Sequence, residues 1–588
     1  MADLPSQWIR VARCTEVPMG EAKAIRLPEG RSIALFNVDG RIYATDNQCP
    51  HMGFPLTRGA VRHGILTCDW HGRSFDLEGG GCFNHECDDL ETFPVELRQD
   101  EIWIQPGDPR YKRRDEHLRL LWEGLLSEDR WTISKAIALL LKGSVPEEEI
   151  VEMALRHLAR HIASSDDAEG GGALSRLING LKIARRYQDA DRLMVLSTAA
   201  RSVAGGAADR LEVVPLPGPV AWNSIDRWTR MFSHDGQAGR IERCLFTACH
   251  LGHQDKILPL LFECAVEPHF LGFAENLLSL GYLAEVVESF GWEESSELSF
   301  NLGAKLLGRR RGEPERFRRD AVSLMASMVD VIEVSNPAAN KVIDYDEDAF
   351  VGALLSVNIQ KSFDAVAAVR KAGVNLDRLI TTLVLLAADR MARTPVNVDA
   401  GWGALTMELN TAASLRTAQR HGGDQAAAKG LFHAAWLLFA DRWLNIPVRP
   451  LRSPLGGDRL SVPNEDAGLR VILNSIASLN VQDVGRQVLE YLNAGYSGDR
   501  LLHEMGRVML WDDTNSRILP TLRTVFDEWE RSSGSDPALG AGHPARYQLL
   551  VGLARFATDI RTNKDSGAAT NTAMRFAEGK TTVEMFEG

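Results

Sequence analysis

Short runs of β-forming, largely hydrophobic residues recur between polar turn residues from residue 7 to about residue 105. β-Branched and aromatic residues are frequent in these runs, and turn-forming residues separate them, which is the pattern of antiparallel strands. Asp39-Gly40, between two such runs, is a strong hairpin signal. The predicted strands are Trp8–Ala12, Ala22–Leu27, Ser32–Val38, Arg41–Ala44, Ile65–Cys68, Phe93–Leu97 and Ile102–Ile104. Short strands at this spacing predict a small barrel or sandwich.

The pattern changes near residue 117, where apolar residues begin to recur as they do on one face of an α-helix. The predicted helices are Leu118–Leu126, Ile133–Leu141, Glu147–Ile162, Leu174–Tyr187, Ala190–Val203, Ile241–Leu251, Lys256–Ala265, Leu271–Phe290, Arg316–Val334, Ala365–Ala372, Leu376–Met391, Leu405–Arg420, Gly430–Leu444, Ala467–Ser478, Val484–Leu492, Ser497–Leu510, Ile518–Glu530 and Tyr547–Asp559. The Pro- and Gly-containing stretch Gln105–Pro109 separates the two patterns.

These patterns predict a multidomain chain. A small all-β domain at residues 1–107 and a linker at 108–116 would precede a large all-α domain at 117–588. No convincing fixed-period repeat runs through the helical part, so a helical bundle and a solenoid-like array both stay open.

Composition is ordinary for a soluble globular protein, with 588 residues, 45% hydrophobic and 25% charged. The net charge of −13 argues against a nucleic-acid partner. No apolar run approaches the ~20 residues of a membrane helix, and the N-terminus lacks the basic-then-apolar order of a signal peptide. Eight cysteines do not make a disulfide scaffold in a chain of this length. We therefore expect a cytoplasmic protein without a membrane partner.

Acidic residues are concentrated at the N-terminus, where residues 1–108 carry a net charge of −7 and the rest of the chain carries −6. An acidic surface would steer this part toward a basic redox partner. A merely solubilising role for the same charges explains the pattern equally well.

Two pairs of cysteine and histidine lie in the β-rich part, as Cys49-Pro50-His51 and Cys68-Asp69-Trp70-His71. Two thiolates and two imidazoles on separate loops suit a [2Fe–2S] cluster with two cysteines on one iron and two histidines on the other. Such a cluster carries single electrons. The motif predicts electron transfer and does not identify the electron acceptor.

These residues, with Met52-Gly53 and Gly72–Asp76 beside them, resemble the Rieske ferredoxin domain, which occurs as a ferredoxin partner or N-terminal domain of bacterial oxygenases. The resemblance covers about the first 105 residues. It implies that Cys49 and Cys68 bind one iron and that His51 and His71 bind the other. Respiratory Rieske proteins carry an extra cysteine in each ligand loop, and the Met52–Phe54 stretch has none. The resemblance therefore favours the ferredoxin and oxygenase type.

Neighbouring residues have two interpretations each. Gly53, Gly64 and Gly72 either let the backbone approach the cluster or meet the needs of turns. Trp70 either shields the cluster or packs as an ordinary core residue. Cys82 and Cys87 flank His85 as C-x2-H-x-C, but no clear fourth metal ligand lies nearby, so a loop with free thiols is the favoured interpretation.

The helical part contains weaker candidates for an additional iron. His157 and His161 share a helix face and could bind one metal, although a pair at a helix edge is the favoured interpretation. A second set is His250, Glu267 and His269, accompanied by His253, Glu263 and Glu275. Helical bundles build di-iron sites from such side chains, but the Glu-x-x-His pattern does not occur twice here. The basic residues Arg309–Arg311 could dock an acidic partner or form a solvated loop.

We therefore predict a Rieske-type oxidoreductase, with oxygenase-related chemistry as one form of it. Its cluster would pass single electrons to an oxygen- or substrate-activating site in the helical domain or docked to it. No dinucleotide fingerprint follows a strand, so an external reductase would supply the electrons. Whether the protein also takes a small-molecule substrate stays open.

The alternatives are a redox-sensing or interaction protein whose helical domain is a binding scaffold, and an electron carrier serving an external oxygenase. The sequence predicts no oligomeric state.

Overall fold

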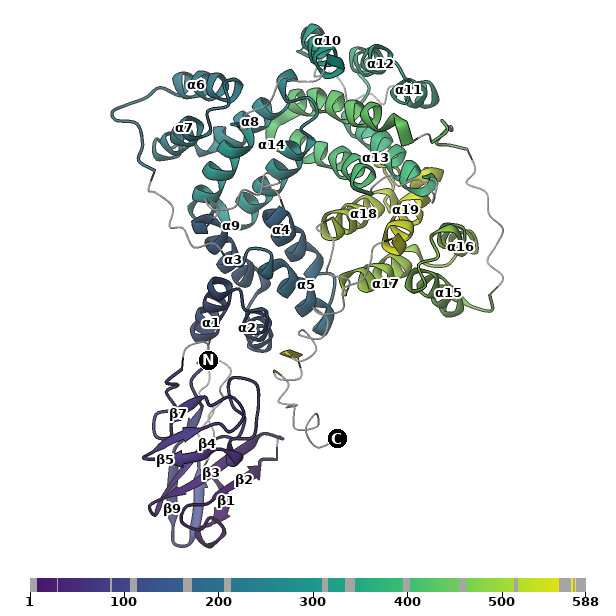
Figure 1. The fold of residues 1–588 in the computed structure, drawn as a ribbon. Coiled ribbons are helices and arrows are strands. Elements are labelled where there is room, and N and C mark those ends of the chain that lie inside the picture. The colour runs from purple at the N-terminus through teal and green to yellow at the C-terminus, as the bar shows by residue number, and fades with distance from the viewer. Residues whose placement is uncertain are drawn as a thin grey trace. The chain divides into compact units, whose positions relative to one another are not determined.

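The computed structural model describes residues 8–28, 30–84, 87–105, 114–161, 172–205, 213–308, 316–333, 344–394, 402–444, 446–453, 462–511, 517–559, 573–574 and 577. An N-terminal β domain precedes a long series of helices (Figure 1). The predicted fold class, a small all-β domain followed by a large all-α part, is confirmed.

The β domain contains ten short strands in three antiparallel sheets. The strands are β1 (Ile9–Arg13), β2 (Ala22–Arg26), β3 (Ser32–Val38), β4 (Arg41–Asp46), β5 (Ala60–Arg62), β6 (Ile65–Thr67), β7 (Ser74–Asp76), β8 (Thr92–Phe93), β9 (Val95–Arg98) and β10 (Glu101–Ile104). The sheet orders are β1-β10-β9, β2-β3-β4-β8 and β5-β6-β7. The predicted hairpin at Asp39-Gly40 joins β3 to β4, and both residues have a positive φ. Strands β5 and β7, of three residues each, were not predicted.

Two hydrophobic groups fill the β domain. One contains Ile33, Leu35 and Ile102, from the first two sheets. The other contains Leu66 and Phe75 of the β5-β6-β7 sheet, together with Cys49 and Cys68. The second group therefore places both candidate thiol ligands in a buried environment.

Nineteen α-helices occur among the described residues. They are α1 (Arg114–Ser127), α2 (Arg130–Lys142), α3 (Glu147–His161), α4 (Gly172–Ala184), α5 (Asp189–Arg201), α6 (Trp222–His234), α7 (Ala238–His250), α8 (Gln254–Ala265), α9 (Ala274–Leu307), α10 (Arg316–Glu333), α11 (Glu347–Leu354), α12 (Ile359–Lys371), α13 (Leu376–Arg393), α14 (Trp402–Ala440), α15 (Glu465–Ala477), α16 (Val481–Asn493), α17 (Gly498–Leu510), α18 (Ile518–Ser533) and α19 (Tyr547–Asp559). No described helix is both long and apolar enough to cross a membrane.

The helix predictions differ from the structure in three respects. Helices α6 and α11 were missed. Helix α9 continues beyond the predicted end at Phe290, and α14 joins two predicted helices. Both long helices contain a glycine with positive φ, Gly291 and Gly423, where the helix axis changes direction. A glycine at each kink lets the helical hydrogen-bonding pattern resume directly afterwards.

Contacts divide the chain into two compact units. The first comprises the described residues of 1–157, 188–205 and 567–588, and the second those of 158–187 and 206–566. The first unit thus includes the β domain and helices α1, α2 and α5, with most of α3. Helix α1 begins at Arg114, inside the range predicted as a linker. The division of the chain into a 1–107 domain, a linker and a 117–588 domain stays a prediction.

Buried ion pairs join distant helices of the second unit. Arg523 of α18 donates two hydrogen bonds to Glu285 of α9, at 2.7 and 2.9 Å. Arg416 of α14 pairs in the same bidentate manner with Glu528 of α18, at 2.9 and 3.0 Å. Removing one partner of such a pair would leave a buried uncompensated charge, at a cost of about 3–5 kcal/mol. These ion pairs therefore stabilise the packing of α9, α14 and α18 against one another.

Candidate functional site

The two candidate ligand loops have the same backbone construction. In the first, Cys49 N donates to Phe54 O at 2.9 Å and Gly53 N donates to Cys49 O at 2.7 Å. In the second, Cys68 N donates to Arg73 O at 2.8 Å and Gly72 N donates to Cys68 O at 3.1 Å. The fifth residue of each loop is a glycine with φ of 81° or 67°. A side chain would be strained at this φ. Turn geometry therefore accounts for both glycines.

The two loops bring the predicted side chains together in two pairs, Cys49 with Cys68 and His51 with His71. Cys49 and Cys68 are buried, each 1% exposed, and their thiols share a hydrogen bond. The rings of His51 and His71 lie 4.8 Å apart between centroids, at an interplanar angle of 90°. One pair of thiols and one pair of imidazoles is the donor set that the sequence predicts.

Backbone N–H groups of each loop point at its cysteine sulfur. His51 and Met52 donate to Cys49, while Trp70 and His71 donate to Cys68. The hydrogen bond from the Cys49 thiol, supported by those from Trp70 and His71, lowers the pKa of Cys68 to about 6. The same thiol contact and burial raise the pKa of Cys49. The loops thus stabilise negative charge on sulfur, which is the metal-binding form of cysteine.

The His51 imidazole is the clearest sign that the site receives another group. Its Nδ1 atom is buried and has no hydrogen-bond partner among the described residues. A buried polar atom without a partner costs about 1–3 kcal/mol. Burial, with a smaller effect from Arg73, lowers the pKa of His51 to about 4. The ring is therefore neutral at pH 7, with a lone pair available to a metal.

No group of three or more His, Cys, Asp or Glu side chains suited to a single metal ion occurs in the described part of the chain. This is compatible with a two-iron cluster, because such a cluster takes two protein ligands on each iron. Trp70 packs between the loops, with ring centroids 5.9 Å from Phe54 and 4.1 Å from His71.

Helix α2 contacts the first ligand loop directly, which sequence analysis missed. Trp131 Nε1 donates to His51 O at 3.1 Å, and Lys135 Nζ donates to Pro50 O at 3.1 Å. Lys135 also pairs with Asp88 at 3.2 Å, and its side chain is only 1% exposed. A lysine inside the apolar stretch Ile133–Leu141 was the available signal, since a buried lysine requires partners.

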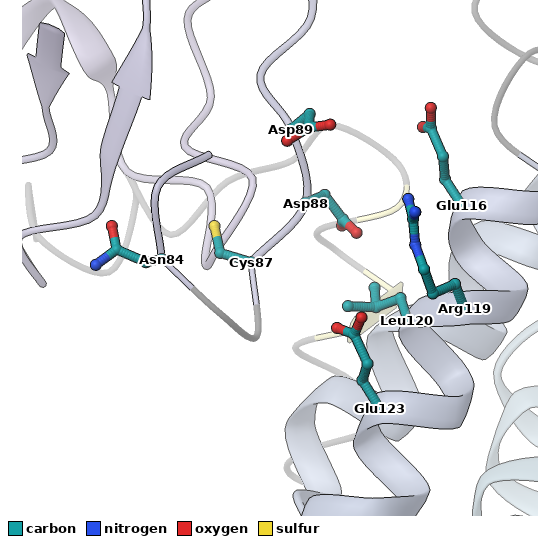
Figure 2. A pocket seen from close by; sticks show the side chains of 8 residues that line it. All are labelled: Asn84, Cys87, Asp88, Asp89, Glu116, Arg119, Leu120 and Glu123. Atoms are coloured by element: carbon teal, nitrogen blue, oxygen red, sulfur yellow. The ribbon is translucent and has the colours of Figure 1, made fainter. Parts of the chain in front are cut away.

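A cavity of about 220 Å³ lies between the β domain and helix α1 (Figure 2). Asn84, Cys87, Asp88 and Asp89 of the β domain line it, together with Glu116, Arg119, Leu120 and Glu123 of helix α1. Among these described residues, Arg119 is the only basic one.

The structure does not support the additional iron predicted in the helical part. His250 is exposed at the end of α7, and Glu267 pairs with Lys429 at 3.0 Å. The His269 ring packs on Phe270, 4.4 Å away between centroids. The three side chains form no described metal-binding group. Short sequence separation brought them together as a candidate, but the helices direct them to different neighbours.

Of the remaining candidates, the structure describes the side chain of His157 but not those of His161, His85 or Arg309–Arg311. His157 is buried, and its Nε2 lies 2.9 Å from Gly205 O. The prediction that it lies at a helix edge is therefore wrong. The His161 side chain, His85 and Arg309–Arg311 lie outside the described residues.

Comparisons with known proteins concern the N-terminal part of the chain. The family profile described as "Rieske [2Fe-2S] domain" matches residues 7–94. The 4beta-methylsterol monooxygenase of Methylococcus capsulatus is 36% identical over 95 residues, which cover 14% of this chain and 25% of that protein. The ferredoxin component of the p-cumate 2,3-dioxygenase system of Pseudomonas putida is 30% identical over 94 residues, covering 16% of this chain and 80% of the relative.

Among solved structures, the ferredoxin of Sphingomonas yanoikuyae B1 is similar at 30% identity. The match covers 17% of this chain and 100% of that one, with a TM-score of 0.17. The chain spans about a quarter of the length of the methylsterol monooxygenase. The family profile ends at residue 94 and does not reach the helices.

Proposed function

Because the chain belongs, through residues 7–94, to the Rieske [2Fe-2S] domain family, we propose that it transfers single electrons through a cluster held by Cys49, His51, Cys68 and His71. The observations that support the proposal are the thiol contact of Cys49 with Cys68, the ring contact of His51 with His71, and the buried His51 Nδ1, which has no partner among the described residues. The cysteines would hold one iron and the histidines the other.

The bound cluster would supply a one-electron couple, and its histidine ligands place the potential of such centres above that of all-cysteine clusters. The chain's own residues prepare this site. Backbone N–H groups stabilise charge on the two sulfurs, and burial keeps His51 neutral. His71 is exposed, whereas His51 lies beneath Trp131. We place the docking of an external reductase at the His71 edge, where an acidic domain would attract a basic partner.

The electron acceptor would be engaged by the helical part. The support is the contact of helix α2 with the carbonyl groups of Pro50 and His51, which links the ligand loop to the helices by two hydrogen bonds. The relatives named as a monooxygenase and as part of a dioxygenase system favour an acceptor that activates oxygen or a substrate. Because the cluster domain is covalently attached to the helical domain, the effective concentration of the electron donor near the acceptor is raised.

Elemental analysis combined with a reductive titration tests this proposal. We expect two irons and two inorganic sulfides per chain, and uptake of one electron per chain. A resident acceptor in the helical part would add a further metal or a further electron. Absence of iron from a folded chain purified without oxygen would refute electron transfer through the cluster.

Replacing His71 by alanine should abolish electron uptake from the reductase.

A redox-sensing scaffold is the second candidate function. It is favoured by Lys135, a buried cation that connects helix α2 to both Pro50 and Asp88. Reduction adds one negative charge to the cluster next to this cation. The sensing function predicts a partner whose affinity differs between the oxidised and reduced chains, and no consumption of oxygen beyond simple reoxidation. Equal affinity in both states, with catalytic oxygen consumption, would favour the oxidoreductase.

The low pKa of His51 predicts how the cluster responds to acid. Only neutral imidazole binds iron, and the pKa of His51 is about 4 instead of the ordinary value near 6.5. Protons therefore compete for this ligand only as the pH falls toward 4. We expect visible absorbance of the cluster to persist at about pH 5.5 and to disappear near pH 4. Half-loss of absorbance near pH 6.5 would contradict the prediction.

A further inference from the structure

A second cysteine pair lies in the segment between β7 and β8, outside the four proposed ligands. Leu90 N donates to Gly80 O at 2.7 Å, which closes the base of this segment. Gly80 has φ of +82°, and a Cβ there would lie 1.9 Å from Leu90 O. Only glycine permits this closure. The closure by Gly80 and Leu90 brings the residues that begin at Cys82 close to the residues that contain Cys87.

A further hydrogen bond holds the two stretches together, because Cys82 N donates to Asp89 Oδ1 at 2.8 Å. Ser74 N of β7 donates to Asn84 Oδ1 at 2.8 Å and so fixes the first stretch against the sheet. The thiols of Cys82 and Cys87 share a hydrogen bond. Two sulfurs in this contact need only a small side-chain movement to reach bonding distance.

The pair is accessible as well as preorganised. Both side chains are partly buried and pack against the hydrophobic group that contains Cys49 and Cys68. Cys82, the proposed first nucleophile, is only partly buried and therefore open to a small molecule, and Cys87 lines the cavity opposite helix α1 (Figure 2). Cys14 and Cys249 are partly buried too. They therefore serve as internal references.

We propose that Cys82 and Cys87 form a reversible disulfide by exchange with a low-molecular-weight disulfide, making this segment a redox-modification site distinct from the iron–sulfur ligands. The Cys82 thiolate attacks one sulfur of the small disulfide, forming a mixed disulfide and releasing one small thiolate. The Cys87 thiolate then attacks the Cys82 sulfur, forming the internal bond and releasing the second small thiolate. Two electrons pass from the pair to the small disulfide, and two protons follow to the released thiols.

The order of attack agrees with the electrostatics of the pair. The hydrogen bond donated by Cys87 lowers the pKa of Cys82 to about 7, while the Cys82 contact and burial raise the pKa of Cys87. Cys82 is therefore the better nucleophile near neutral pH. The iron–sulfur cluster accepts only one electron, so it does not replace the small disulfide as oxidant.

Cysteine mapping on the full-length holoprotein tests the proposal. The protein is equilibrated under argon with set ratios of reduced and oxidised glutathione, alkylated with iodoacetamide, digested and analysed by mass spectrometry. We expect a Cys82–Cys87 crosslinked peptide whose amount rises with the oxidised fraction and falls again on reduction. Cys14 and Cys249 should stay alkylated or carry single adducts. Visible absorbance recorded in parallel reports whether the cluster is retained.

Variants sharpen the result. Cys82→Ser and Cys87→Ser should each leave a single glutathione adduct on the remaining cysteine, whereas the control Cys14→Ser should form the internal bond as the unaltered protein does. Complete alkylation of Cys82 and Cys87 at every ratio would overturn the proposal. So would a crosslink from either residue to Cys49 or Cys68 in place of the internal bond. Cysteine mapping of the unaltered protein alone shows whether the Cys82–Cys87 bond forms, even if a variant fails to fold.

Discussion

Replacing Cys68 by alanine should reduce the iron content from two atoms per chain to nearly none. The thiol lies in the buried group with Cys49, within reach of two backbone N–H donors. Alanine offers no donor atom, and one iron would be left with a single cysteine ligand. Iron and sulfide analysis, together with visible absorbance, measures the loss.

Cys14→Ala is the matched control for this experiment. Cys14 is a partly buried cysteine of the same β domain, but it packs against the other hydrophobic group, which contains Ile33 and Ile102. We expect this variant to keep its iron and its absorbance. If Cys68→Ala retained two irons with an unchanged spectrum, the assignment of Cys68 as a ligand would be wrong. Equal iron loss in both variants would indicate general unfolding.

The second large effect is expected from Lys135→Met. The lysine ammonium donates to Pro50 O between the first two proposed ligands, so the variant removes a buried positive charge next to the cluster. A unit charge at about 10 Å and an effective dielectric constant of about 20 contributes about 1.7 kcal/mol, or about 70 mV for one electron. Loss of the charge disfavours the reduced state. We therefore expect the reduction potential to fall by an amount of this order.

A spectroscopically monitored redox titration measures this shift. Arg130→Met is the control, because it removes the same charge from an exposed position of the same helix, where water screens it. Its potential should change little. The Lys135 variant should also lose about 1–3 kcal/mol of unfolding free energy, because Pro50 O and Asp88 lose their buried donor. An unchanged potential in a folded Lys135→Met protein would contradict a role for this charge.

The residue pattern along the chain was enough to predict most of the strands and helices. Short β-rich runs between turn residues predict the strands of the first 105 residues, and Asp39-Gly40 supplies the positive φ that its hairpin requires. The missed elements had weak local signals. Strands β5 and β7 are three residues long, and the continuity of α9 and α14 depends on single glycines, Gly291 and Gly423, that pattern alone treats as breaks.

Sequence by itself was enough to predict the donor set of the site and to place residues 7–94 in the Rieske domain family. Cys49, His51, Cys68 and His71 stand at spacings that suit two short loops, and spacing is a local property that the chain displays directly. The additional iron at His250, Glu267 and His269 shows the limit of the same reasoning. Proximity along the chain does not decide which way neighbouring helices direct their side chains, and these three go to different partners.

Only the tertiary structure decided what surrounds the proposed cluster. The contact of Lys135 with Pro50 joins residues 85 positions apart, and that of Trp131 with His51 joins residues 80 positions apart. The meeting of Cys82 with Cys87 depends on the closure of the segment by Gly80 and Leu90. Such contacts arise from the packing of whole elements, which follows from the burial of many side chains together. The local pattern of the chain thus determined which residues could act, and packing determined the charges and thiols placed beside them.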